Sequence, residues 1–498
     1  MAEQIASAFF ACLNPMSLVL ITMGVAWGII GGAIPGISPS IAIVLALPFT
    51  YHMETAVAVV LLGAVYTGAC YGSSIPAILI GTPGAPASAA TVADGYMLGK
   101  QGKGLDALGA SLLSGVSGGI IGTLILCAFV VPLGKIALSF GAPEYFAICI
   151  LGLTIVASVG GGNMVKAGIS VVMGLAVATI GLDAFSGTPR FTMGIPALRD
   201  GINDVSAMIG LFAVGEVLNE IFEYAVTAPI KADIRMKLPF RLMREKLGLV
   251  LRSGVIGTFV GILPGAGSSL AGFVAYASAK NISRHPEEFG QGSFEGLIAP
   301  ETANNACVGG SLVPVLALGV PGSPAAAMIL AAFIMHGIVP GPALFQNNPQ
   351  MVYTIFVGLF VAQVLLFFVG YVFIKPMLKI IDIDKNVLNV LIMILVLTGA
   401  YSLTNRVFEP IQVLVFGVLG FWIKRNGYSP SALVLGLVLG GMIENELRRS
   451  LIMSGGSYLI FFERPLCLAI LLLSAASLVW SAVKGRSSRN KKSVANSA

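Results

Sequence analysis

The chain is poor in charged residues. Only 10% of its 498 residues are Asp, Glu, Lys or Arg, whereas soluble domains contain about 25%. Its mean hydropathy is +0.91. The apolar residues form runs close to the ~20 residues that cross a bilayer as a helix, namely 17–34, 108–134, 142–160, 205–226, 351–374, 386–404 and 465–483. The sequence therefore predicts a polytopic membrane protein and excludes a soluble one.

These apolar runs lack the alternation of polar and apolar residues that barrel strands require. Because lipid offers no hydrogen-bond partners to an open backbone, continuous runs predict helices. We expect an all-α fold with about 10–12 spans, including re-entrant hairpins. Residues 1–10 contain Glu3 but no Lys or Arg. They lack the basic region of a secretory signal, so we expect the first apolar run to remain part of the structure.

Residues suited to hydrolytic or metal chemistry are also scarce. The three histidines have no metal-type neighbours, and the six cysteines lack paired spacing. Neither an HExxH motif nor a Walker P-loop is present. Ser38 lies in a Gly-Ile-Ser-Pro sequence that resembles an intramembrane protease motif, but no residue is recognisable as its base. We expect no enzyme activity, no metal, no cofactor and no ATP-driven transport by this chain alone.

Basic residues concentrate in two segments. Seven lie within 231–252, and five follow Trp480. Lys100, Lys424 and their basic neighbours add smaller clusters. Because positive residues mark the cytoplasmic side, we expect a periplasmic N-terminus and a cytoplasmic C-terminus. The net charge of +6 is read as this orientation signal, and we expect no nucleic-acid partner.

Two stretches of the sequence occur twice. GAIPG at 32–36 returns as GILPG at 261–265, and residues 72–89 align with 310–327 without a gap at 9 identities. Several prolines and glycines keep their register, as Pro83 and Pro321 do. Glycine and alanine bias inflates such a match but does not readily bring three prolines into register, so the pattern indicates a duplication.

The two copies also start from opposite sides. The first begins at a charge-poor N-terminus and leads to Lys100, whereas the second begins at Arg252 and leads to an uncharged stretch. We therefore predict two inverted repeats with broken helices, a common plan of secondary transporters. The predicted organisation is a first membrane repeat at 1–230, a basic cytoplasmic linker at 231–252, a second membrane repeat at 253–483 and a basic cytoplasmic tail at 484–498.

In each repeat, Pro and Gly interrupt an apolar run at two places. The freed backbone must face protein or a wet cavity, and a helix start there suits an anion. The predicted broken-helix backbone comprises Pro35, Gly36, Gly81, Pro83, Gly84, Pro264, Gly265, Gly319, Pro321 and Gly322. The predicted substrate ligands are Ser38, Ser40, Ser73, Ser74, Thr82, Ser268, Ser269, Asn304, Asn305 and Ser311. The alternative is that these small residues only allow close helix packing.

An acid inside an apolar run is by default a functional hypothesis. Glu301 is such an acid, and the repeat alignment places Asn304 and Asn305 opposite Tyr66 and Thr67. We predict Glu301, Asn304 and Thr67 as candidates for coupling to Na+ or H+. A structural role for Glu301, at an interface or in a hydrogen-bonded cluster, stays open.

The sequence resembles the large membrane subunit of the bacterial tripartite tricarboxylate transporters. The resemblance extends from about residue 15 to about residue 480 and is strongest in 32–51, 71–98, 261–277, and in PETANNA with the later GVPGSP, within 300–333. It implies uptake of citrate or other small carboxylates across the bacterial inner membrane, driven by a Na+ or H+ gradient. It also implies two partners, a small four-helix membrane subunit and a periplasmic substrate-binding protein. From the residues alone, a small-anion channel or facilitator and an intramembrane hydrolase stay open as alternatives.

Overall fold

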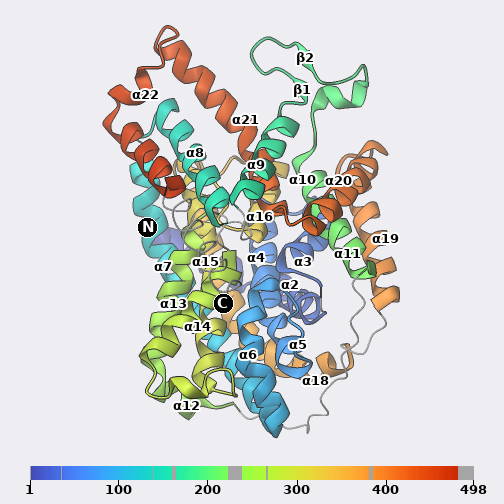
Figure 1. Ribbon diagram of the computed structural model, residues 1–498, viewed down its shortest axis with the longest axis vertical. Helices are drawn as coiled ribbons and strands as arrows, with labels where there is room; N and C mark the ends of the chain where they lie inside the picture. The colour runs from blue at the N-terminus through green and yellow to red at the C-terminus, as the bar shows by residue number, and fades with distance from the viewer. Residues whose placement is uncertain are drawn as a thin grey trace, which may run out of the picture.

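Helices form almost all of the computed structural model (Figure 1). It describes residues 2–34, 36–137, 139–159, 164–222, 238–264, 267–380 and 385–479. Within these ranges the only strands are β1 (Gly181–Leu182) and β2 (Pro189–Arg190), which pair antiparallel. The prediction of an all-α fold is confirmed. Pro35, Gly265, residues 231–237 of the predicted linker and the predicted tail lie outside the described residues.

Four helical segments of the described chain are long and apolar enough to cross a bilayer, namely Pro15–Ala33, Thr55–Leu79, Pro86–Ala137 and Pro349–Phe373. Eight apolar helices of 10–17 residues accompany them. The polytopic membrane class is thereby confirmed, while the number of spans and the inverted orientation stay predictions.

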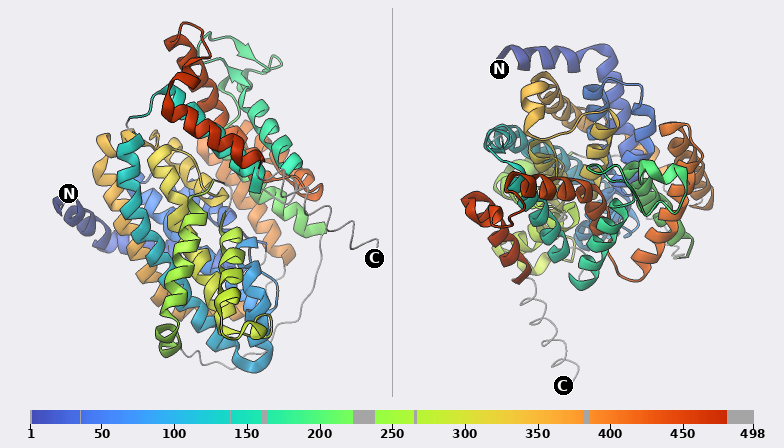
Figure 2. Two further views of the ribbon diagram at one scale, coloured as in Figure 1. Left: turned by 60° about the vertical axis from the view of Figure 1, so that its left-hand side comes forward. Right: turned by 90° about the horizontal axis from the view of Figure 1, so that it is seen from above.

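The first half of the chain contains the following elements: α1 (Ala2–Leu13), α2 (Pro15–Ala33), α3 (Pro39–Ala46), η1 (Leu47–Thr50), α4 (Thr55–Gly72), α5 (Ser74–Leu79), η2 (Pro86–Ser88), α6 (Ala89–Leu98), η3 (Gly99–Lys103), α7 (Gly104–Ala137), α8 (Ala142–Val159), α9 (Met164–Ala178), the strands, η4 (Pro196–Asp200), α10 (Asp204–Ile209), η5 (Gly210–Val214) and α11 (Gly215–Phe222). Helix α1 lies at the edge of the helical body (Figure 2).

The second half contains α12 (Phe240–Glu245), α13 (Leu247–Ile262), α14 (Gly267–Ile282), η6 (Pro286–Glu288), α15 (Phe294–Leu318), α16 (Pro324–Met335), α17 (Pro342–Asn347), α18 (Pro349–Ile380), α19 (Lys385–Thr404), α20 (Phe408–Arg425), α21 (Pro430–Met453) and α22 (Ile460–Glu463). The centre of the fold is formed by α4, α7, α15 and α18, in which α4 and α7 pack against each other and against both α15 and α18.

Glycines allow the central helices to approach closely. A Cβ atom added to Gly118 of α7 would lie 2.1 Å from the carbonyl oxygen of Thr302 on α15. One added to Gly122 would lie 2.3 Å from the carbonyl oxygen of Ala306. Both distances are too short for a real contact, so any larger residue would push the two helices apart.

The two halves make matching glycine contacts. A Cβ atom on Gly28 of α2 would lie 2.2 Å from the carbonyl oxygen of Val65 on α4. The aligned glycine, Gly257 of α13, would place its Cβ 2.2 Å from the carbonyl oxygen of Ala303 on α15. The duplicated sequence therefore forms the same helix–helix contact twice, between α2 and α4 and between α13 and α15.

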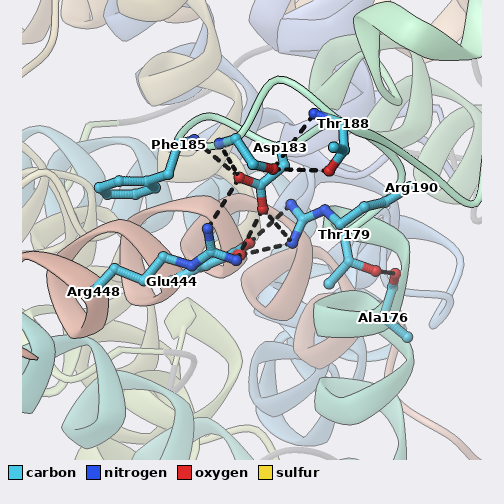
Figure 3. A network of polar contacts seen from close by, with 9 residues as sticks. Ala176, Thr179, Asp183, Phe185, Thr188, Arg190, Glu444 and Arg448 are labelled. Carbon is cyan, nitrogen blue, oxygen red and sulfur yellow. Dashed lines mark hydrogen bonds and ion pairs between the residues drawn. The ribbon is translucent and has the colours of Figure 1, made fainter. Parts of the chain in front are cut away.

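An ion network ties the β1–β2 hairpin to α21 (Figure 3). Arg190 binds Glu444 through both of its terminal nitrogens, at 2.7 and 3.0 Å. Arg448 contacts the carboxylates of Asp183 at 2.8 Å and of Glu444 at 2.7 Å. The hydrogen bond from Arg448 holds the pKa of Asp183 well below its ordinary value, and the backbone N–H of Ser186 acts in the same direction. The hairpin is thus held to α21 by opposite charges.

Candidate transport site

A cavity of about 600 Å³ lies where broken segments of both halves meet. The first half contributes two parts of its lining, Gly36 with Ser38–Ser40, and Thr82–Ala87. The second half contributes Gly267–Ser269 and Ser323–Ala325. The remaining lining comes from α4, η5, α11, α20 and the start of α21. Segments separated by more than two hundred residues therefore form one site.

The first hairpin of each half turns at this cavity. Helix α2 ends at Ala33, and α3 begins at Pro39 after a turn in which Gly36 has a φ of 95°. Ser38 caps α3, because its Oγ accepts a hydrogen bond of 3.4 Å from the backbone N–H of Ile41. Proline at the first helical position fits this start, since the missing N–H would have no intrahelical partner. In the second half, α13 ends at Ile262 and α14 begins at Gly267.

The second break of each half is a loop containing the Gly-x-Pro-Gly pattern. Gly81 and Gly319 have positive φ values of 69° and 73°, a conformation that suits glycine. Helix α16 restarts after the second loop and is capped by Ser323, whose Oγ accepts a 3.1 Å hydrogen bond from the N–H of Ala326. The helices therefore end and restart where the sequence predicted breaks.

Each loop presses against the hairpin of its own half. A Cβ atom on Gly84 would lie 2.2 Å from the carbonyl oxygen of Gly32. One on Gly322 would lie 2.5 Å from the carbonyl oxygen of Gly261. A backbone hydrogen bond of 3.2 Å from Gly36 to Gly84 reinforces the first contact. Loop and hairpin therefore pack as one unit in each half.

The cavity is electrostatically suited to an anion. Helices α3, α14 and α16 begin at its wall, as does the turn η2 that leads into α6. Helix starts present free N–H groups and a positive partial charge. The hydroxyls of Ser38, Ser40, Ser268 and Ser269 lie among the lining residues. The helix starts and the serine hydroxyls thus supply uncharged donors.

One ion pair lies in the lining. Among the described residues that line the cavity, Lys424 and Glu216 are the charged ones. The Lys424 Nζ lies 2.6 and 2.5 Å from the two Glu216 carboxylate oxygens. The Lys424 side chain is 46% exposed, so the protein does not enclose the cavity at this end. A substrate carboxylate could compete with Glu216 for the ammonium group.

A buried tyrosine links the halves at the cavity. Tyr66 of α4 is 1% exposed, and its hydroxyl lies 3.1 Å from Ser323 Oγ and 3.5 Å from Ser311 Oγ. Neither Tyr66 nor Ser323 is among the predicted substrate ligands. The repeat alignment, which pairs Tyr66 with Asn304, and the Ser-Pro capping pattern at residue 323 were the available signals.

The cavity brings together eight of the predicted site residues, namely Gly36, Ser38, Ser40, Thr82, Pro83, Gly84, Ser268 and Ser269. The other described ones do not line it, namely Thr67, Ser73, Ser74, Gly81, Pro264, Glu301, Asn304, Asn305, Ser311, Gly319, Pro321 and Gly322. Besides Tyr66 and Ser323, the prediction also missed Glu216, Asn219, Lys424 and Ser431, because they lie outside the repeated motifs. Whether the predicted residues bind substrate stays a prediction.

Two predicted serine ligands have local partners instead. Ser73 Oγ donates to the carbonyl oxygen of Cys70 at 2.8 Å, and Ser311 Oγ donates to that of Val308 at 3.1 Å. The carbonyl oxygen of Ser73 accepts hydrogen bonds from Gly84 N, at 3.0 Å, and from Ser88 Oγ, at 2.8 Å. Ser73 therefore helps to hold the first Gly-Pro loop in place.

Glu301 lies within α15 and has no exposed surface. Its carboxylate accepts hydrogen bonds from Ser74 Oγ and Ser111 Oγ, each at 2.7 Å, and from Thr91 Oγ1. The described chain offers it no Lys, Arg or His within ion-pair distance. Ser74, another predicted ligand, is thereby engaged with Glu301. Asp94 is also buried, and it accepts hydrogen bonds from the backbone N–H groups of Gly290, Gly292 and Ser293.

The remaining predicted residues form a buried polar layer between α4, α7, α15 and α18. Asn304 Nδ2 donates to the carbonyl oxygen of Cys70 at 3.3 Å, and Asn305 Nδ2 donates to that of Glu301 at 3.0 Å. Gln363 of α18, which the sequence analysis did not select, donates through Nε2 to Thr67 Oγ1 at 3.1 Å. This amide layer is separate from the cavity lining.

Comparison with known proteins identifies the family. The model of the tripartite tricarboxylate transporter TctA family matches residues 18–435. An uncharacterized 52.8 kDa protein in the TAR-I ttuC' 3' region of Agrobacterium vitis is 36% identical over 491 residues, 98% of each chain. An uncharacterized protein in the TAR-II ttuC' 3' region of the same organism is 37% identical over 223 residues, 45% of this chain and 92% of that protein. No solved structure matches. The resemblance seen in the motifs is therefore confirmed, and the chain belongs to the tripartite tricarboxylate transporter TctA family.

Proposed function

We propose that this chain is the transport subunit of a secondary carrier that takes up citrate or another small di- or tricarboxylate. The observation that carries the proposal is the cavity at which helix starts from both halves meet. These helix ends attract carboxylates, and Lys424 adds one full positive charge that Glu216 partly neutralises. A cavity of about 600 Å³ also leaves room for water around a small acid.

Transport would proceed by alternating access of one site to the two sides of the membrane. The matching contacts of Gly28 and Gly257 support the idea of two equivalent halves around that site. The positive-inside rule would place the end of α20, with Lys424 and Arg425, on the cytoplasmic side. With that orientation, the exposed Lys424 and the buried Tyr66 would correspond to an inward-facing state. The N-terminus would be periplasmic and the C-terminus cytoplasmic, in the bacterial inner membrane.

The family membership supports the remaining parts of the proposal. A periplasmic binding protein would deliver the substrate, and a small four-helix membrane subunit would complete the carrier. A Na+ or H+ gradient would drive uptake, because the sequence contains no Walker P-loop.

The test is uptake of labelled citrate into proteoliposomes that contain this chain, the small subunit and the binding protein. Uptake is measured with and without inward Na+ and H+ gradients. We expect accumulation of citrate that depends on a gradient. Lys424→Gln should weaken this accumulation, and Lys280→Gln should leave it unchanged. Lys280 is a suitable control because it is exposed and does not line the cavity. Absence of uptake with every gradient, for each carboxylate that the binding protein retains, would refute the proposal.

A further inference from the structure

The amide layer between α4, α7, α15 and α18 contains three buried oxygen atoms without a hydrogen-bond partner. They are Asn304 Oδ1, Asn305 Oδ1 and Gln363 Oε1. Each of the three residues is only 1% exposed. Buried polar atoms in folded proteins almost always have a partner, so a group of orphaned acceptors requires an explanation such as an ion or water.

The orientation of the two asparagine amides is fixed by their donor ends. Asn304 Nδ2 and Asn305 Nδ2 each donate to a backbone carbonyl oxygen, that of Cys70 and that of Glu301. Turning either amide over would place two acceptor oxygens against each other. The NH2 groups are therefore used within the protein, and the oxygens are the ends that lack a partner.

Two glycines make room for these amides on α7. A Cβ atom on Gly115 would lie 3.1 Å from Asn305 Nδ2, and one on Gly119 would lie 2.1 Å from Gln363 Oε1. Residues four apart on a helix are neighbours, with Cβ positions about 5–6 Å apart. The two amides therefore lie against adjacent turns of α7, where side chains other than glycine would displace them.

The buried carboxylate of Glu301 also favours a cation nearby. Glu301 lies one helical turn before Asn305 on α15, is fully buried and has three hydroxyl partners, while no cationic side chain of the described residues pairs with it. An ionised carboxylate at such a place is costly without a positive partner. Amide oxygens are too weakly basic to hold a proton near neutral pH, but they are good ligands for a hard cation.

We propose that the side-chain oxygens of Asn305, Gln363 and Thr67, together with Asn304, bind Na+, and that the charge of Glu301 balances the ion. The proposal rests on the proposed function and chooses Na+ over H+ as the coupling ion. Thr67 directly follows Tyr66, so the ion site and the cavity share one turn of α4. Glu301 thereby acts through its charge, and the amides are the ligands.

The test uses the full-length purified chain in lipid nanodiscs without any carboxylate, with ²²Na+ as the probe. Competing NaCl or KCl is added at constant ionic strength. We expect ²²Na+ to bind saturably. Unlabelled Na+ should displace the bound ²²Na+, and K+ should not. Asn305→Leu and Gln363→Leu should each weaken binding by about 10- to 100-fold, the range seen when metal sites lose supporting groups. Gln363→Glu, which retains an oxygen ligand, should keep binding.

Asn389 provides a matched control. Its Oδ1 is also buried without a partner, but it lies on α19, outside the amide layer. Asn389→Leu should leave Na+ binding unchanged. If the leucine variants do not give a monodisperse protein, Thr67→Val and Thr67→Ser are compared instead. Only serine retains the hydroxyl ligand, so Na+ binding should weaken in Thr67→Val and persist in Thr67→Ser.

Two results would overturn the proposal. One is a wild-type chain without saturable Na+ binding, as expected if the layer holds only an ordered water. The other is unchanged binding in correctly folded Asn305→Leu and Gln363→Leu variants. Because the assay contains no carboxylate, a wrong substrate assignment would not affect either outcome.

Discussion

A single added methyl group should separate the two packed segments that form each half of the site. In Gly84→Ala the new Cβ would lie 2.2 Å from the carbonyl oxygen of Gly32, and in Gly322→Ala it would lie 2.5 Å from that of Gly261. Real Cβ atoms essentially never approach another atom within 3.0 Å, so the backbones must move apart by at least 0.8 Å and 0.5 Å, respectively. Such overpacking typically costs about 1–3 kcal/mol.

This movement shifts the loop that lines the cavity relative to Ser38 and the start of α3. We expect both variants to melt at a lower temperature in detergent and to lose at least about tenfold in citrate uptake, since misplacing a positioned group by about 1 Å can cost about 10²-fold. Gly84→Ala should have the larger effect because its contact is shorter. Gly168→Ala is the control, because a Cβ there would have no neighbour within 4 Å. Wild-type melting and uptake in Gly84→Ala would refute this account of the site.

Three further changes test other parts of the structure. Lys424→Gln should raise the KM for the carboxylate by about tenfold, which is the low end for a charge-assisted hydrogen bond at a part-exposed site. Lys280→Gln should leave this KM unchanged. Equal KM values in Lys424→Gln and wild type would contradict the anion site. Because folding lowers the pKa of Asp183, its stabilising effect is present above the unfolded pKa of about 3.9 and is lost as pH falls below that value toward the folded pKa. The melting temperature should therefore fall less on acidification in Arg448→Met than in wild type. A decline equal to that of wild type would exclude Arg448 as the cause. Tyr66→Phe should destabilise the chain by only about 1 kcal/mol in chemical unfolding, because both serines that contact its hydroxyl keep other partners; a loss above about 3 kcal/mol would mean that the tyrosine has a further role.

The breaks in the helices could be predicted because their causes are local. Proline removes a backbone donor and restricts the preceding residue, and glycine accepts the positive φ seen at Gly81 and Gly319. The duplication then indicated that the breaks of both halves belong together. This reasoning placed Ser38, Ser40 and the pair Ser268 and Ser269 at one site, and all four line the cavity.

The sequence could not show which face of a helix meets the cavity. Asn304 and Asn305 precede the second break in sequence, yet α15 continues past them to Leu318 and buries both among other helices. Lys424 and Glu216 come from α20 and α11, which contain no repeated motif, so only the tertiary fold brings them to the site. From the sequence, Lys424 indicates only the orientation of the chain. Its partner Glu216 lies 208 residues away, so the ion pair cannot be foreseen from local sequence.

The position of α4 gives a physical reason for substrate and ion to depend on each other. Successive residues of a helix point about 100° apart, as follows from 3.6 residues per turn. Tyr66 therefore faces the cavity and Ser323, while Thr67 faces Gln363 in the amide layer. A small rotation or shift of α4 must change both contacts together, because a packed helix moves as a rigid body. An ion that fixes Thr67 would consequently fix Tyr66, and a substrate that displaces Ser323 from Tyr66 would act back on the ion site with the same coupling free energy.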